Sequence, residues 1–176
     1  SRNDYIYNDQ TNNKYISNKI SLAFTHILRA SVDGIVIGGH SDTGMIPLTR
    51  LATRNSIRIS DIISDERLIQ VKEDTKVGGA TLTKLLGTSA WYAPGAAVSS
   101  LVQSIACDQN KMFPCSAFLD GHYGLDDLCI GVPVILGKNG VERVIELDLN
   151  DEEKQLLAES ETAVREVKAV LDGMYS

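Results

Sequence analysis

A histidine stands directly after a short apolar run in the first third of the chain. The segment Ile35-Val-Ile-Gly-Gly-His40-Ser-Asp-Thr-Gly44 begins with apolar, mostly β-branched residues and continues with two glycines. The run predicts a buried strand over 35–39, and the glycines permit a tight turn with space beside the imidazole. A histidine at a strand end can be held rigidly while it meets a substrate, so His40 is a candidate general acid/base. The alternative for such a histidine is a hydrogen-bonded structural role.

The neighbours of His40 do not indicate a hydrolase. Ser41 and Asp42 follow it closely enough to suggest a serine triad. Consecutive side chains at a strand end point to different sides, however, so the three cannot align as nucleophile, base and orienting carboxylate. The segment therefore predicts acid/base chemistry without a nucleophile.

The elements that must position His40 follow from the spacing of apolar residues and the turn signals between them. The predicted order begins with strands at 35–39, 45–53 and 56–59. A long helix follows Ser60 or Ser64 and is interrupted at Gly78-Gly79, and the first turn of the next helix holds Pro94. Strands at 113–119 and 129–136 come next, then a hairpin at 138–140 that leads into a strand ending at Leu149, and a final helix capped by 150–153. The interruption costs about 2 kcal/mol of helix propensity, so it needs a packing or functional reason, such as close approach of another backbone. Helices, then an antiparallel meander, then a closing helix make an α+β arrangement.

Two helices carry apolar stripes that we expect to be buried. In the helix that begins near Pro94 the stripe is Ala97, Val98, Leu101, Val102 and Ile105. In the final helix it is Leu156, Leu157, Val164, Val167, Val170 and Leu171. His122, in the sequence Gly121-His-Tyr-Gly124, is expected at a surface turn.

The first 31 residues differ in composition from the rest. Residues 1–19 mix asparagine, tyrosine and aspartate without a regular period, which predicts an irregular leader. Residues 20–28 then carry apolar side chains at the spacing of a short amphipathic helix. We therefore expect a separate leader over 1–31 and a folded domain over 32–176.

Composition excludes several classes of function. The 176 residues carry a net charge of −6 without a basic block, so nucleic acid is not an expected partner. No apolar run approaches the roughly 20 residues that cross a bilayer, and no secretory h-region is present, so no membrane association is expected. Cys107, Cys115 and Cys129 have no metal-binding spacing, which predicts reduced, mostly buried thiols in a cytoplasmic protein and no metal site.

Several motifs in order resemble the C-terminal half of NAD-dependent malate dehydrogenases, of the bacterial type that is similar to lactate dehydrogenases. They are the Gly-Gly-His-x-Asp segment, Met45-Ile-Pro-Leu-Thr-Arg50, Gly78-Gly-Ala80, Thr88-Ser-Ala-Trp-Tyr-Ala-Pro94 and the run Gly131 to Arg143. The resemblance covers about Val32 to Leu171. It implies the C-terminal domain fold of that family, with an antiparallel sheet and long helices.

The resemblance also implies site residues and a reaction. His40 stands where the family's histidine exchanges a proton with the substrate while NAD exchanges a hydride, in the oxidation of L-malate to oxaloacetate within the tricarboxylic acid cycle. Ser89 matches a small polar position that lines the substrate pocket, although a serine near a helix start can equally be its cap. The substrate would be a small dicarboxylate, and family members assemble as homo-oligomers.

Other parts of the family's machinery are missing from these 176 residues. No G-x-G-x-x-G fingerprint or strand–helix alternation occurs, so the Rossmann domain that binds NAD is absent and no cofactor-binding residue is assigned. Relatives carry an Asp-x-x-Arg pair before the catalytic strand, whereas Asn13 and Ile16 stand at that distance here. We therefore expect a truncated oxidoreductase chain that is inactive alone. The alternative is a catalytically silent remnant or an oligomerisation module.

Overall fold

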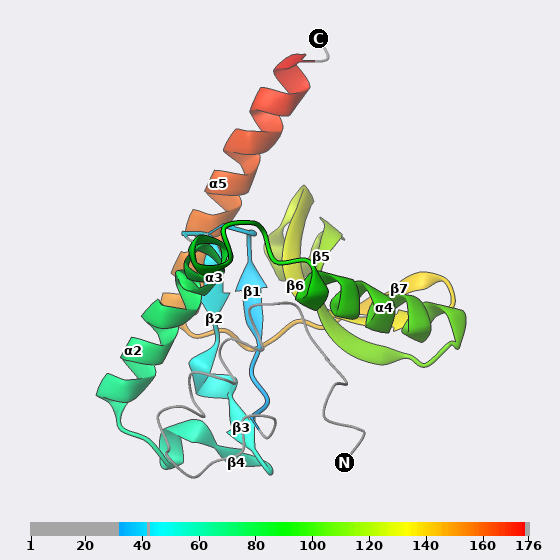
Figure 1. The fold of residues 1–176 in the computed structure, drawn as a ribbon. Coiled ribbons are helices and arrows are strands. Elements are labelled where there is room, and N and C mark those ends of the chain that lie inside the picture. Colours follow the sequence, from blue (N-terminus) through cyan, green and yellow to red (C-terminus); the bar gives the residue numbers. More distant parts are fainter. Residues whose placement is uncertain (1–31, 42, 175–176) are drawn as a thin grey trace.

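An antiparallel sheet lies at the centre of the fold, in a computed structural model that describes residues 32–41 and 43–174 (Figure 1). The strand order is β2-β1-β6-β5, and β7 pairs with β6 beside this path. The bounds are Val36–Gly38 for β1, Met45–Pro47 for β2, Lys111–Asp120 for β5, Asp126–Gly137 for β6 and Gly140–Val144 for β7. A separate hairpin joins β3 (Thr53–Arg54) to β4 (Ile57–Arg58). The expected leader and its helix at 20–28 lie outside the described residues.

The strands predicted at 113–119 and 129–136 are both present, as β5 and β6, and both contribute side chains to the core. Phe113, Ala117 and Leu119 on β5 are buried, and they share the core with Leu128 and Ile130 of β6. Strand β1 adds Ile37 to this core, and at Gly38 it lies opposite Gly131 of β6. The catalytic candidate thus follows a strand that is fixed on both edges by neighbours.

Four described helices surround the sheet, and together with it they make the α+β fold that the sequence predicts (Figure 1). They are α2 (Asp65–Lys76), α3 (Gly78–Leu86), α4 (Tyr92–Ala106) and α5 (Asp151–Met174). Helix α2 contacts β2, the start of α5 packs on β1, β2 and β6, and α4 lies along β6.

The predicted interruption of the long helix is confirmed, and at Gly79 the expected close approach of another backbone does not occur. Val77 breaks the helical path between α2 and α3, and Pro94 lies in the first turn of α4, as predicted. A Cβ added at Gly79 would meet no atom within 4 Å, so no other backbone approaches this glycine closely.

Two predicted strands are shorter than expected. The strand predicted over 45–53 ends at Pro47, because the chain turns into a 3-10 helix at Thr49–Leu51 before β3. The strand predicted to reach Leu149 ends at Val144. Beyond it, the Tyr123 hydroxyl donates to the carbonyl of Ile145 at 2.7 Å and accepts from the amide of Leu147 at 2.9 Å. The Tyr123 side chain thus pairs two backbone groups that a neighbouring strand would otherwise pair.

The apolar stripes of α4 and α5 are only partly buried. On α4, Val98 and Val102 are exposed, whereas Ala97, Leu101 and Ile105 are partly buried. On α5, Leu157 is buried, and Leu156 and Val164 are partly buried. The end of α5 extends away from the sheet (Figure 1), so the remaining predicted core residues of that helix are exposed, namely Val167, Val170 and Leu171. Helical spacing identified an apolar face but could not show what covers it.

The thiol prediction is corrected in one respect. All three cysteines are free, but Cys107 and Cys129 are exposed and only Cys115 is partly buried.

Among the described helices, none has the length and apolar character required to cross a bilayer.

Candidate active site

His40 lies two residues beyond β1, in the turn that leads to β2, and its side chain is exposed. No described residue forms a hydrogen bond with its imidazole, which does not support the structural alternative for this histidine. The direction of the imidazole therefore depends on how the backbone of the turn is held.

The glycines at the turn allow other backbone segments to approach closely, and do not merely leave space beside the imidazole. Gly38 has a φ of +96°, and a Cβ there would lie 2.2 Å from the carbonyl oxygen of Gly44. A Cβ on Gly131 would lie 2.6 Å from the carbonyl oxygen of Gly38. Three backbone segments thus meet at distances that only glycine permits.

Ser41 closes the turn with its own side chain. Its Oγ accepts a hydrogen bond from the Gly44 amide at 2.9 Å, and its carbonyl accepts from Met45 at 3.1 Å. The hydroxyl of Ser41 is therefore committed to the turn, in agreement with the rejection of a hydrolase triad. Asp42 lies outside the described residues.

Sequence reasoning missed a buried serine that contacts this turn from α5. The Ser160 Oγ accepts a hydrogen bond from the Gly39 amide at 2.7 Å and donates one to the Gly44 carbonyl at 2.9 Å. The available signal was the helical spacing of Leu157, Ser160 and Val164, which places a serine within the predicted buried stripe of the last helix.

The start of α5 is anchored to the same region by a charged network, also missed. Arg50 donates to both carboxylate oxygens of Glu153, from Nε at 3.1 Å and from Nη2 at 2.8 Å. Asn150 and Glu153 form the reciprocal capping box that the Asn150–Glu153 prediction implied, because the amide of each donates to the side chain of the other. Helix α5 therefore begins at a fixed place.

The charges of this network set the pKa of the Glu153 carboxyl. Burial alone would raise this pKa, but hydrogen bonds from Arg50 and Asn150, with the charges of Arg50 and Lys72, outweigh burial and lower it. The hydrogen bond to Glu153 correspondingly raises the pKa of Arg50. Both groups are thus charged at neutral pH.

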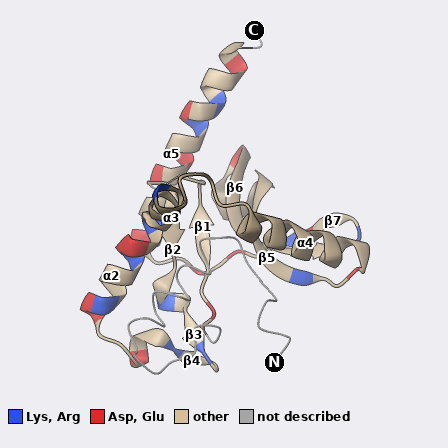
Figure 2. Cartoon of the chain, in the orientation of Figure 1, with Lys and Arg blue, Asp and Glu red and all other residues tan. Residues whose placement is uncertain are grey.

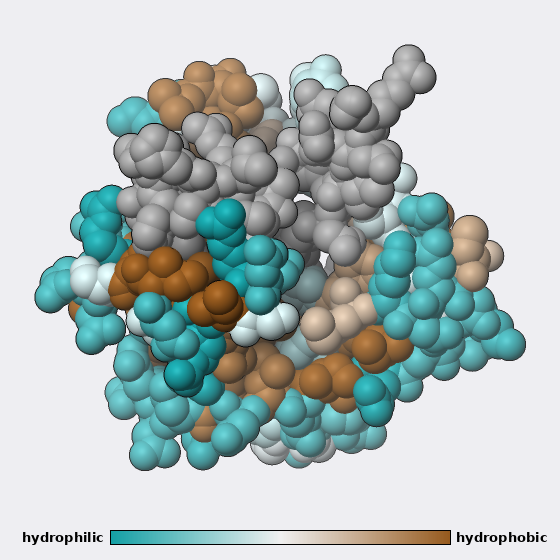
Figure 3. All heavy atoms as spheres, turned by 90° about the horizontal axis from the view of Figure 1, so that it is seen from below, coloured by the Kyte–Doolittle hydropathy of each residue, from teal (hydrophilic) through white to brown (hydrophobic). Residues whose placement is uncertain are grey.

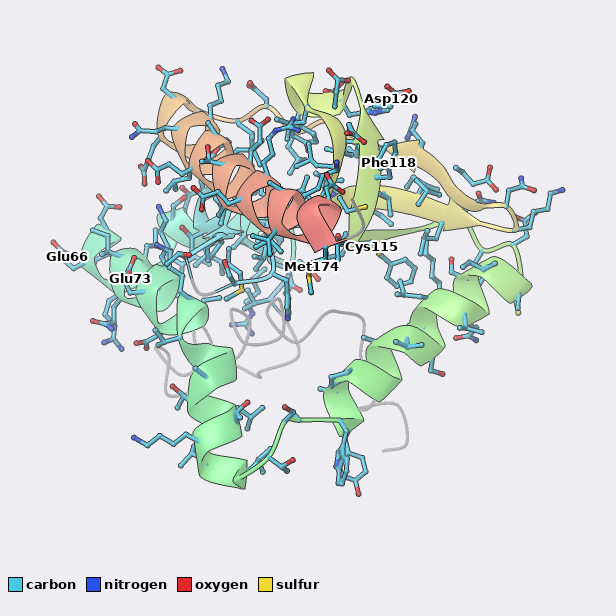
Figure 4. The ribbon with its side chains drawn as sticks, turned by 90° about the horizontal axis from the view of Figure 1, so that it is seen from above. Glu66, Glu73, Cys115, Phe118, Asp120 and Met174 are labelled. Atoms are coloured by element: carbon cyan, nitrogen blue, oxygen red, sulfur yellow. The ribbon has the colours of Figure 1, made fainter. Side chains whose placement is uncertain are left out.

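Ser89 lies in the connection between α3 and α4, and its side chain is exposed. In Figure 4 this connection lies at the opposite side of the molecule from α5, which packs on the His40 turn. No hydrogen bond joins Ser89 to His40, and no described helix is capped by its hydroxyl. The described residues do not bring the two predicted site residues together, so the pocket role of Ser89 stays a prediction.

The remaining chemical groups add no further site. His122 lies half-buried in the 3-10 turn His122–Gly124 between β5 and β6. Within the described residues no cluster of histidine, cysteine or carboxylates could hold a metal ion. The positions Asn13 and Ile16 lie outside the described residues.

Residues 19–172 match the family described as lactate/malate dehydrogenase, alpha/beta C-terminal domain. The chain is 61% identical to the malate dehydrogenase of Bacteroides thetaiotaomicron over 140 residues, which cover 80% of this chain and 45% of the relative. The malate dehydrogenase of Parabacteroides distasonis is also 61% identical over 140 residues, which cover 80% of this chain and 45% of that relative.

Solved structures agree with these matches. The malate dehydrogenase of Salinibacter ruber superimposes with a TM-score of 0.87 at 40% identity, over 93% of this chain and 53% of that one. A lactate dehydrogenase of Cryptosporidium parvum, solved with lactic acid and β-nicotinamide adenine dinucleotide, gives 0.85 at 33% identity, over 92% of this chain and 52% of that one. The chain thus spans about half the length of the relatives it matches. With the histidine turn at the end of β1 and the α/β fold around it, the chain belongs to the lactate/malate dehydrogenase family and contains its C-terminal domain.

Proposed function

We propose that this chain is the substrate-binding and catalytic domain of a malate dehydrogenase-type oxidoreductase, with His40 as proton acceptor. The observation that carries the proposal is an exposed histidine on a rigid turn in a chain 61% identical to a malate dehydrogenase. The reaction is the interconversion of L-malate and oxaloacetate with NAD and NADH. The substrate is accordingly a small dicarboxylate.

His40 supplies the acid/base half of this chemistry. Oxidation of a secondary alcohol removes the hydroxyl proton while the C–O bond becomes a carbonyl, and a neutral imidazole nitrogen can accept that proton. In the reverse direction, the protonated imidazole returns that proton to the oxygen. The exposed side chain of His40 is free to meet a substrate oxygen, since the described residues leave the ring without a hydrogen-bond partner.

The described residues do not fit the nucleotide cofactor. All of their strand pairs are antiparallel, whereas the dinucleotide fold needs parallel strands joined through helices. The sequence also has no G-x-G-x-x-G turn to approach a pyrophosphate. We therefore confine the proposal to the substrate side of the reaction and expect no turnover from the 176 residues alone.

The test measures NADH oxidation with oxaloacetate by the purified chain, first alone and then mixed with the separately produced N-terminal half of the Bacteroides thetaiotaomicron relative. We expect no rate above background alone and measurable turnover in the mixture. Circular dichroism establishes that the chain is folded in both samples.

The matched control mixes the two separately produced halves of the relative itself. Turnover by the chain alone would contradict the proposal that these 176 residues hold only the substrate side of the site. If the relative's halves restore activity and the mixture with this chain does not, the catalytic proposal is wrong.

A second candidate function is an oligomerisation module. Helix α4 contains no charged residue (Figure 2), and Tyr92 at its start is 86% exposed. Figure 3 shows further apolar surface between hydrophilic residues on the lower face of the molecule. Surfaces of this kind favour self-association. Sedimentation of the chain and of the Val98→Lys/Val102→Lys variant tests this function, because charges on α4 should lower the mass of an assembly that uses it.

A further inference from the structure

Ser160 differs from three helical threonines in what its hydroxyl contacts. The hydroxyls of Thr75, Thr81 and Thr162 each donate to the carbonyl four residues earlier in the chain, which is the usual local arrangement. The Ser160 hydroxyl instead donates to Gly44 and accepts from Gly39, which lie 116 and 121 residues earlier in the chain. Ser160 is only 2% exposed, so water cannot replace either bond.

The two glycines before His40 lie close to side chains of α5. A Cβ on Gly38 would lie 3.2 Å from the Ser160 Oγ, and a Cβ on Gly39 would lie 3.3 Å from it. A Cβ on Gly39 would also lie 3.1 Å from Cγ2 of Val164, one turn further along α5. Each distance is tighter than ordinary contact, so a Cβ at either position would push atoms of α5 away by a few tenths of an ångström.

The bonds lie at both ends of the catalytic turn. Gly39 directly precedes His40, and Gly44 directly precedes β2. One hydroxyl therefore ties the outgoing and returning arms of the turn to the same point on α5, and the Arg50–Glu153 pair and the capping box fix where that helix begins.

We propose that Ser160 is a positioning residue, which orients the His40 imidazole by locking the turn that carries it to α5. The proposal rests on the proposed function only in that His40 is taken as the proton acceptor. Because displacement of a catalytic group by about 1 Å can cost about 100-fold in rate, loss of this tie should lower kcat.

The experiment compares Ser160→Ala with Ser104→Ala. Ser104 is a matched control, because it is a fully buried helical serine whose Oγ donates to a remote backbone carbonyl, that of Leu136, at 2.8 Å. Both variants leave a buried backbone group without its partner, so both should lower the melting temperature. A merely structural role for Ser160 would make the two variants alike in every other measurement.

Two readouts separate positioning from stability. In the isolated chain, hydrogen exchange of the Gly39 amide should accelerate at least tenfold in Ser160→Ala and not in Ser104→Ala. In the mixture with the relative's N-terminal half, Ser160→Ala should lower kcat 10- to 100-fold with little change in the KM for oxaloacetate, whereas Ser104→Ala keeps both. Ser160→Thr, which retains a hydroxyl, should recover part of the lost kcat.

The outcomes distinguish this inference from the proposed function. If His40→Ala abolishes turnover and Ser160→Ala lowers kcat no more than Ser104→Ala, the positioning role is wrong and the proton acceptor stands. If His40→Ala retains turnover, the proposed function is wrong. If no mixture turns over, hydrogen exchange still tests the proposal. An unchanged exchange rate of the Gly39 amide in Ser160→Ala would show that Ser160 does not hold the His40 turn to α5. Should Ser160→Ala not fold, Ser160→Cys, which is close in volume, takes its place in each comparison.

Discussion

The His40 turn and the connection between α3 and α4 carry the two predicted site residues, and their structural support differs. The turn after β1 is held by hydrogen bonds from Ser41 and Ser160 and by three glycines whose backbones nearly touch. The connection at Ser89 is exposed, and Trp91 and Tyr92 beside it are 69% and 86% exposed. The His40 turn is therefore held by contacts within the chain. The α3–α4 connection is held, among the described residues, only by the helices at its two ends.

This contrast shows how the site is divided. His40, the proposed proton acceptor, is placed by contacts within one domain, from strands and a helix more than 100 residues apart. Those contacts do not reach Ser89, the predicted pocket residue. A rigid turn at His40 and an exposed apolar connection at Ser89 support the proposal that a second protein surface completes the site.

Replacing His40 gives the largest expected effect. In the mixture with the relative's N-terminal half, His40→Ala should lower kcat by about 10²- to 10⁴-fold, because the variant lacks the group that we propose takes the hydroxyl proton. Stability should change little, since the side chain is exposed. Steady-state kinetics and thermal unfolding measure the two effects. The control His122→Ala should keep kcat, and equal losses in both variants would argue against a specific role for His40.

Glycine substitutions break or spare the His40 turn directly. Gly38→Ala should destabilise the fold by about 4 kcal/mol, because its Cβ would lie 2.2 Å from a backbone oxygen at a φ of +96°. Gly79→Ala has open space around it within α3 and should stabilise by about 0.5–1 kcal/mol. Denaturant unfolding gives both free energies. A Gly38 variant as stable as the parent chain would show that the turn is not rigid.

The anchor of α5 makes stability depend on pH. Glu153→Gln should cost about 1.5–3 kcal/mol near pH 7, because Arg50 loses a charged partner whose side chain is only 8% exposed. The folded-state pKa of Glu153 is lowered, so its contribution is complete above the ordinary value of about 4.3 and disappears as the pH falls through the folded pKa. The difference between variant and parent in unfolding free energy should therefore shrink below about pH 4.

Glu152 provides the matched control for this measurement. Its side chain is 69% exposed in its pair with Lys72, so Glu152→Gln should cost no more than about 1 kcal/mol. Equal costs for the two substitutions would contradict the anchoring role of Glu153.

Replacing Ser89 should have the mildest consequences, and they should be confined to substrate binding. Ser89→Ala should leave the unfolding free energy unchanged within about 0.5 kcal/mol, because the side chain is exposed. In the complemented assay it should raise the KM for oxaloacetate by about three- to tenfold, the value of one lost hydrogen bond. An unchanged KM would leave Ser89 without a role in the pocket.

Local signals along the chain were enough to predict the order of the elements and the candidate histidine. The strands β5 and β6, the interruption near Gly78, Pro94 in the first turn of α4 and the cap at Asn150 were predictable because local backbone preferences and side-chain periods act over a few residues. The family was also readable, since its motifs lie in order along the chain.

Which apolar faces are covered, and which residues hold the His40 turn, depend on how distant segments of the chain pack together. Val98 and Val167 have the right spacing for a core, yet they are exposed, because burial depends on which element arrives from elsewhere in the chain. The roles of Ser160 and Arg50 likewise depend on partners about 100 residues or more away, at Gly39 and Glu153. Local patterns state what a residue prefers, and the packing of distant segments decides what it contacts.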